Sequence, residues 1–233
     1  MTTRNGDHPK VALILSGCGV FDGSEIHEAV SCLVHLSRAG AAVACFAPDI
    51  TAPAVNHLTG QAEPAPRSVL AESARIARGK IAPLSGVRAA DFDAAVFPGG
   101  FGAAKNLCDF AARGAACAVN PEVERVIKDF HAAGKPVGMC CIAPVLAAKV
   151  LGKAGGGPGV DVTIGDDAGA AAAIAQMGSR NIVRPVTEAC ADERSALITA
   201  PAYMYADAPV HEVYEGIGRM IDGVLARAAK RKT

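Results

Sequence analysis

Two adjacent cysteines, Cys140 and Cys141, follow an apolar segment over residues 136–139 that is predicted to be a strand. Pro144 is tolerated only in the first turn of a helix, so the next helix is predicted to begin near residues 142–143. The unpaired amides and the dipole of a helix N-terminus lower the pKa of a thiol and raise its thiolate fraction. The sequence therefore predicts a cysteine nucleophile at this turn, with two inert buried thiols as the alternative.

Of the two thiols, Cys141 is the better candidate. A sharp strand–nucleophile–helix turn needs small neighbours close to the nucleophile. Ala143 is small and lies two residues after Cys141, whereas the bulky Ile142 lies two residues after Cys140. We therefore assign the nucleophile to Cys141.

A glycine-rich segment near the N-terminus, SGCGVFDGSEIHE over residues 16–28, carries the candidate acid–base groups. It contains Cys18, and it places the carboxylates of Glu25 and Glu28 three residues apart, on one face of the helix that follows. A simpler interpretation stays open, in which Ser24 caps the helix and the carboxylates complement its positive end.

A second glycine-rich loop, PGGFG over residues 98–102, follows a short apolar strand. Its glycines would let backbone N–H groups approach a bound oxyanion. The loop lacks the Lys-Ser/Thr pair of a phosphate-binding loop and the full G-x-G-x-x-G pattern, which argues against a nucleotide cofactor. A purely structural turn is the alternative.

The elements that must position these loops alternate between strand and helix. Such βα units predict a doubly wound, mostly parallel sheet, in which ligands bind at the carboxyl ends of the strands. A loop or small hairpin is expected over residues 51–66, and the glycine-rich residues 152–159 are interpreted as a loop within one domain over 1–233. The predicted strands cover 11–16, 42–46, 94–97, 136–139, 160–164, 182–186 and 196–199, and the predicted helices cover 24–39, 67–78, 121–133, 168–178 and 210–229.

Composition excludes several classes of partner. The 23 basic and 23 acidic residues cancel, and aromatic residues are scarce, so we expect no nucleic-acid partner. No apolar run approaches the roughly 20 residues that span a bilayer, so we expect no membrane association. The N-terminus shows no secretory pattern, and the eight cysteines lack metal-site spacing, so we expect no metal. Reduced thiols and a cytoplasmic location are expected.

Several segments together resemble one protein family over nearly the whole chain, from about residue 10 to 225. The chain is similar to the ElbB group, also called sigma cross-reacting protein or ES-one-like, in the PfpI-like branch of the class I glutamine-amidotransferase-like superfamily. The resemblance implies a flavodoxin-like three-layer sandwich with a cysteine nucleophile elbow, and a homodimer. It rests on SGCGVFDGSEIHEAV, CFAPD, NHLTG, FPGGFGAAKNL, GKPVGMCCIAP and ITAPAYM.

Position by position, the resemblance implies that Cys141 is the elbow cysteine and that Glu28 hydrogen-bonds to it. The amides of Gly100 and Ile142 would be oxyanion-hole donors, with Gly99 beside them in the substrate-binding loop. Three more residues are expected around this site rather than in it. These are Cys18, Glu25 and His27, and His27 is expected at the rim.

One departure from the superfamily limits the possible reactions. Glutamine amidotransferases use a Cys-His-Glu triad, but no histidine occurs here between His131 and His211. Ile142 stands where the PfpI proteases have a histidine. The sequence therefore argues against both glutamine hydrolysis and proteolysis.

The activity that the resemblance implies is a glutathione-independent glyoxalase, a lyase that converts glyoxal to glycolate through a cysteine hemithioacetal. It would need no cofactor, and its partner would be a small dicarbonyl substrate. The group's usual name also links it to isoprenoid biosynthesis. The alternatives are a non-catalytic regulatory or redox-sensing protein with an amidotransferase-like scaffold, and a deglycase or amidase that uses the same thiol.

Overall fold

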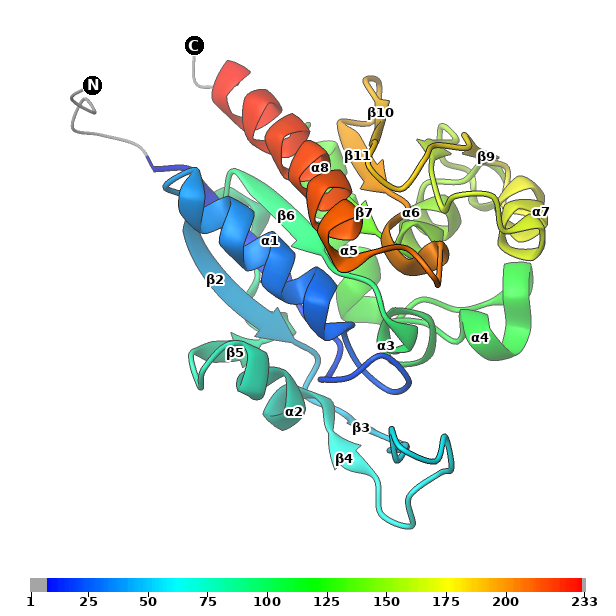
Figure 1. Ribbon diagram of the computed structural model, residues 1–233. Coiled ribbons are helices and arrows are strands. Elements are labelled where there is room, and N and C mark those ends of the chain that lie inside the picture. The colour runs from blue at the N-terminus through cyan, green and yellow to red at the C-terminus, as the bar shows by residue number, and fades with distance from the viewer. Residues whose placement is uncertain (1–7, 232–233) are drawn as a thin grey trace.

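The computed structural model describes residues 8–231, and their main element is a seven-stranded sheet in the order β10-β11-β7-β6-β1-β2-β5 (Figure 1). Every pairing in this sheet is parallel except that between β10 and β11. The sheet strands are β1 (Lys10–Ile14), β2 (Ala42–Ala47), β5 (Ile81–Pro83), β6 (Ala94–Phe97), β7 (Val137–Cys140), β10 (Cys190–Asp192) and β11 (Leu197–Ala200).

Helices cover both faces of the sheet. On one face α1 and α8 lie side by side, with α2 near the sheet edge. The opposite face is covered by α5 and α6, and α7 packs against α6 at the side of the sheet (Figure 1). This is the expected three-layer, mostly parallel α/β sandwich of the flavodoxin type. The helices are α1 (Ile26–Arg38), α2 (Val69–Ile76), α3 (Phe101–Lys105), α4 (Phe110–Arg113), α5 (Pro121–Ala132), α6 (Pro144–Val150), α7 (Ala168–Gln176) and α8 (Val210–Lys230).

Strand β1 shows why the apolar runs form this sheet. Alternate residues point to opposite faces of a strand. Leu13 therefore packs into the core under α1 and α8, while Ala12 and Ile14 pack into the core under α5 and α6. A strand that is buried on both faces must be apolar at every position, as residues 11–15 are.

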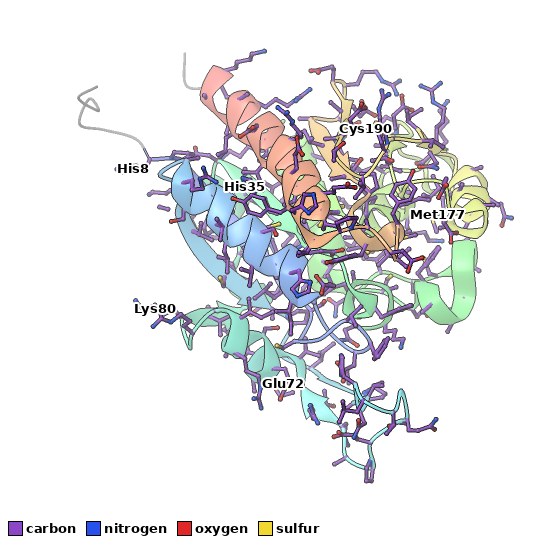
Figure 2. The ribbon with its side chains drawn as sticks, in the orientation of Figure 1. His8, His35, Glu72, Lys80, Met177 and Cys190 are labelled. Atoms are coloured by element: carbon purple, nitrogen blue, oxygen red, sulfur yellow. The ribbon has the colours of Figure 1, made fainter. Side chains whose placement is uncertain are left out.

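Small residues let the helices pack closely. The imidazole of His35 on α1 lies between α1 and α8, where its Nε2 is 2.9 Å from the carbonyl oxygen of Tyr214 (Figure 2). A Cβ on Gly218 would come within 2.6 Å of that ring, so a glycine is required for the contact.

Most of the predicted elements are confirmed to within a few residues, but the predicted strand over 182–186 is wrong. Its place is taken by β9 (Arg180–Asn181), which pairs in parallel with β8 (Asp161–Val162) in a separate two-stranded sheet. The ladder ends with the bond from Ile182 N–H to the Val162 carbonyl, because the chain after β8 turns at Gly165, which has φ +70° and accepts from the Asn181 side chain through its carbonyl.

The hairpin expected over 51–66 is confirmed. Strands β3 (Thr51–Ala52) and β4 (Arg67–Ser68) pair antiparallel, and the bridge between Val55 and Ala62 continues the hairpin. Between residues 8 and 231, no helix combines the length and apolar character that a membrane crossing would require.

We predict that Gly138→Val lowers the free energy of unfolding by about 1–3 kcal/mol, because overpacking a dense core forces its neighbours apart. A Cβ on Gly138 would lie 2.9 Å from Cγ2 of Val224 on α8 and 3.6 Å from Sδ of Met220. Urea unfolding measures the change. Gly86→Val is the matched control, since no atom lies within 4 Å of a Cβ there. Equal stability of the two variants would contradict this account of helix–sheet packing.

Candidate active site

Cys141 lies in a strained turn between β7 and α6. Its φ is +57°, a value that non-glycine residues rarely adopt, and its N–H donates to the carbonyl oxygen of Ala200 at 3.0 Å. Pro144 is the first residue of α6, as its ring requires. The predicted strand–nucleophile–helix turn is therefore present, and its strain marks a candidate functional residue.

Glu28 is completely buried, and its carboxylate faces the Cys141 turn. Two backbone N–H groups donate to it: that of Gly99 to Oε2 at 2.9 Å and that of Tyr203 to Oε1 at 3.2 Å. The Cys140 thiol donates to Oε2 at 3.8 Å. The carboxylate of Glu28 is thus the point where four elements meet: α1, β6, β7 and the turn after β11.

The pKa of Glu28 is raised to about 7. Burial is the largest cause, and repulsion from the charge of Glu25 adds to it, while the hydrogen bonds from Tyr203, Cys141 and Gly99 oppose the shift. A carboxyl group with this pKa can both accept and release a proton near neutral pH.

The expectation that the helix N-terminus lowers the pKa of Cys141 is wrong. Burial, followed by the charge of Glu28, raises the pKa of this thiol well above its usual range. The N–H groups of Gly100 and Ile142 point at the sulfur and lower the pKa, but they do not outweigh burial. The free protein therefore holds Cys141 as a thiol, which must give up its proton when it reacts.

Gly99 and Gly100 permit the close contact between the PGG loop and its neighbours. A Cβ on Gly99 would lie 2.3 Å from Cβ of Cys141 and 2.6 Å from Oε2 of Glu28. Gly100 has φ +92°, and a Cβ there would lie 2.3 Å from the backbone nitrogen of Glu25. No other residue fits at either position, so the loop is more than a generic turn.

The interpretation of Ser24 as the helix cap is wrong. Helix α1 begins at Ile26, and Glu25 is its N-cap, with Oε2 accepting from Glu28 N–H at 2.7 Å. The hydroxyl of Ser24 instead accepts from the N–H of Ser16, because the loop folds back on the end of β1. Glu25 thus has the capping role, one residue later than expected, and its carboxylate adds negative charge next to Glu28.

His27 and Cys18 lie outside this cluster. The side chain of His27 is 59% exposed, and its Nδ1 is 3.0 Å from the hydroxyl of Tyr203. Cys18 lies in a recess near the hairpin, and burial followed by the charge of Glu72 raises the pKa of its thiol. Between residues 8 and 231, no three His, Cys, Asp or Glu side chains come together as metal ligands.

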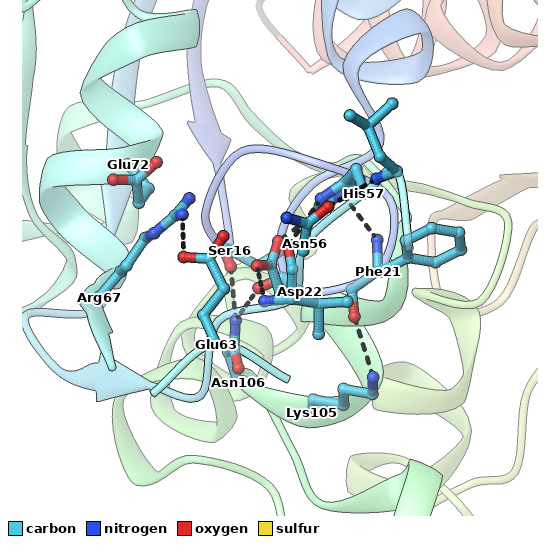
Figure 3. A network of polar contacts seen from close by, with 12 residues as sticks. Ser16, Phe21, Asp22, Asn56, His57, Glu63, Arg67, Glu72, Lys105 and Asn106 are labelled. Carbon is cyan, nitrogen blue, oxygen red and sulfur yellow. Dashed lines mark hydrogen bonds and ion pairs between the residues drawn. The ribbon is translucent and has the colours of Figure 1, made fainter. Parts of the chain in front are cut away.

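Two groups in and around the site were missed by sequence reasoning. Tyr203 donates its backbone N–H to Glu28, and the only signal was its place in the ITAPAYM motif. His57 reaches from the hairpin to the 16–28 loop, where its Nε2 accepts from Phe21 N–H at 3.2 Å, and Asp22 Oδ2 accepts from Val55 N–H (Figure 3). The only sequence signal for His57 was its place in the NHLTG motif.

Comparison with known proteins identifies the family. No family model matches the chain. A human protein named glutamine amidotransferase-like class 1 domain-containing protein 3, mitochondrial, is 53% identical over 95% of this chain and 84% of its own length. The rat ES1 protein homolog, mitochondrial, is 52% identical over 95% of this chain and 85% of its own. The chain belongs to the ES1 family.

A solved structure extends the comparison to the fold. The isoprenoid biosynthesis protein with an amidotransferase-like domain from Ehrlichia chaffeensis superimposes with a TM-score of 0.87 and 34% identity. The alignment covers 94% of this chain and 99% of that one. The family resemblance inferred from the motifs and the flavodoxin-like fold are both confirmed.

The expectation of a cytoplasmic location is wrong, since the human and rat relatives are both named as mitochondrial proteins. That expectation rested on cysteines that form no disulfide bonds, and none of the eight cysteines forms a disulfide in the structure. Free thiols indicate a reducing environment but do not say which compartment provides it.

We predict that Glu28→Gln changes the pH dependence of stability. The carboxyl has its ordinary pKa of about 4.5 in the unfolded chain and about 7 in the folded one. The protonated form therefore stabilises the fold at low pH, and that contribution is lost as pH rises towards and through 7. From pH 4.5 to 8 the variant should gain up to about 3 kcal/mol relative to wild type.

Urea unfolding of both proteins across this pH range measures the difference. The exposed Glu188→Gln is the control, and its difference from wild type should stay constant. A constant difference for Glu28→Gln as well would mean that Glu28 titrates normally in the folded protein.

Proposed function

We propose that this protein is a cysteine-dependent, cofactor-independent enzyme that converts glyoxal to glycolate. The observation that carries the proposal is the placement of Cys141 between a buried carboxyl that titrates near neutral pH and two backbone N–H donors. Glu28 supplies the carboxyl, and Gly100 and Ile142 supply the donors. A nucleophile, a base and an oxyanion site are the groups that such a reaction requires.

In the first step the Cys141 sulfur attacks one aldehyde carbon of glyoxal. Because the resting group is a thiol, its proton passes to the Glu28 carboxylate as the carbon–sulfur bond forms. The N–H groups of Gly100 and Ile142 lie beside the sulfur, where they would stabilise the developing oxyanion. Return of the proton from Glu28 to that oxygen gives the hemithioacetal.

In the second step the Glu28 carboxylate removes the proton from the sulfur-bearing carbon, and the electron pair forms a carbon–carbon double bond while the neighbouring carbonyl oxygen becomes an enediolate oxygen. That oxygen takes the hydroxyl proton of the sulfur-bearing carbon, which leaves the negative charge on the oxygen of the sulfur-bearing carbon. Glu28 then gives the proton to the neighbouring carbon, which becomes a hydroxymethyl group. The sulfur-bearing carbon becomes the carbonyl of a thioester. Water finally adds to the thioester, glycolate leaves, and the Cys141 thiol is restored.

The surroundings of the site favour a small neutral substrate. Only 8% of the surface of Cys141 is exposed, which suits a two-carbon molecule. Lys105, the last residue of α3, donates to the carbonyl oxygen of Phe21 at 2.9 Å and lies 5.0 Å from the ring centre of Phe101. Lys105 is thus already bonded within the protein. Binding of a phosphorylated metabolite usually requires arginine or several cations.

The non-catalytic redox sensor is less well supported. Oxidants select exposed cysteines with a low pKa, but Cys141 is buried and its pKa is raised. A link to isoprenoid biosynthesis rests on the name of the Ehrlichia chaffeensis protein. It would place the proposed reaction in that context without changing its chemistry.

We predict that purified wild-type protein turns over glyoxal and that Cys141→Ala abolishes turnover, since the variant lacks the sulfur that forms the proposed hemithioacetal. Glu28→Gln should lower kcat/KM by roughly two to four orders of magnitude, the usual contribution of general acid–base catalysis. Cys18→Ala is the matched control for a second accessible thiol and should retain wild-type activity. Glycolate formation measured by chromatography is the readout, and unimpaired turnover by Cys141→Ala would refute the mechanism.

We also predict that kcat/KM for glyoxal rises about tenfold between pH 6 and pH 8, because the ionised fraction of a base with a pKa of about 7 rises by that factor. The residual activity of Glu28→Gln should lack this dependence. A wild-type profile that stays flat between pH 6 and 8 would remove Glu28 from the role of base.

A further inference from the structure

A short turn between β11 and α8 reaches back to the start of α1 and makes two bonds there. The backbone N–H of Tyr203 donates to Glu28 Oε1 at 3.2 Å, and the phenol oxygen of Tyr203 lies 3.0 Å from Nδ1 of His27. The two rings lie beside each other with centroids 5.9 Å apart. Tyr203 therefore holds two neighbouring residues of one helix, one by its backbone and one by its side chain.

The turn adopts a conformation that it would not keep by itself. Ala202 is completely buried and has φ +47°, in the left-handed region that residues with a Cβ avoid. Such a residue keeps its conformation only where surrounding contacts enforce it. The Tyr203 N–H that reaches Glu28 follows directly from this residue, so its direction depends on how firmly the turn is held.

We infer that the hydrogen bond between Tyr203 and His27 clamps this turn onto α1 and so presents the Tyr203 N–H to Glu28. This makes Tyr203 and His27 positioning residues for the carboxylate. The inference deepens the proposed function, because the proposed general base is the group that is positioned, but the clamp itself can be tested without any turnover.

A clamp of this kind has a direct consequence for proton affinity. A hydrogen bond donated to a carboxylate stabilises the charged form, and the Tyr203 N–H is the largest of the influences that lower the pKa of Glu28. Releasing the turn would weaken that bond and raise the pKa further. The other titratable groups that face Glu28 are Glu25 on its own helix and Cys140 and Cys141 from β7 and its turn.

The phenol of Tyr203 also belongs to these surroundings. Its own pKa is raised by burial and by the charges of Glu25 and Glu28, so it stays protonated at neutral pH. His27 Nδ1 lies 3.8 Å from Glu25 Oε1 as well, so substitution of His27 alters one contact of Glu25. Tyr203→Phe leaves that contact intact, and the two variants therefore separate the clamp from the His27–Glu25 contact.

The experiment is a pH titration of the Glu28 carboxyl by carbon NMR in protein labelled with ¹³C at glutamate side chains, with the signal assigned by its loss in Glu28→Gln. Tyr203→Phe and His27→Ala should each raise the midpoint by about half a pH unit to one pH unit, the effect expected when one hydrogen bond to a carboxylate is weakened. His27→Asn, which keeps a hydrogen-bonding atom near the position of Nδ1, should restore most of the wild-type midpoint.

The control is Tyr205→Phe, two residues further along. Its hydroxyl donates to the Arg184 carbonyl at 2.8 Å and is not bonded to α1, so the Glu28 midpoint should not move. In the double variant His27→Ala/Tyr203→Phe the midpoint should match that of the single variants, since both remove the same bond. His27 is exposed, so His27→Ala tests the clamp even if Tyr203→Phe fails to fold.

A wild-type midpoint in both single variants would overturn the clamp. A midpoint that rises in His27→Ala alone would also overturn it and would assign the effect to the His27–Glu25 contact. If the wild-type protein fails to turn over glyoxal while the midpoints move as expected, the clamp stands and the proposed reaction fails.

Discussion

The buried carboxylate of Glu28 is the constraint that the rest of the structure must satisfy. An ionised group in the protein interior is costly unless hydrogen bonds replace the water that it loses. Here the replacement comes from the ends of two strands that are far apart in sequence, through the N–H groups of Gly99 after β6 and Tyr203 after β11. The carboxyl ends of the central strands must therefore converge on the first turn of α1.

Two interlocking loops fix this convergence. The 16–28 loop and the PGG loop exchange backbone hydrogen bonds, from Glu25 N–H to the Gly99 carbonyl at 3.0 Å and from Gly102 N–H to the Gly23 carbonyl at 2.9 Å. A Cβ on Gly102 would lie 2.5 Å from the hydroxyl of Ser16, so the loops approach as closely as backbone can. The glycines of both loops thus serve the placement of Glu28 as much as the binding of an oxyanion.

Sequence reasoning succeeded where one local rule dominates. Residues 94–97 are apolar throughout and form a buried strand, and Pro144 marks the first turn of α6 because its ring fits nowhere else in a helix. The contact between Glu28 and Cys141 followed from the family resemblance. The predicted strand over 182–186 is wrong because an apolar pattern does not show that its partner strand β8 ends at Val162, before the turn at Gly165.

The properties of the site that sequence could not give are those set by competition between long-range effects. A helix N-terminus lowers the pKa of a thiol, but at Cys141 burial and the charge of Glu28 outweigh it, and neither is visible in the local sequence. The hydrogen bond that Tyr203 N–H donates to Glu28 depends on the backbone of Ala202. Ala202 has a left-handed conformation, which no propensity predicts for alanine. In this site the chemistry of each group is determined by the neighbours that the fold brings to it. A thiol with a high pKa next to a carboxyl with a pKa near 7 is therefore best understood as a single acid–base pair, in which proton transfer accompanies attack by the sulfur.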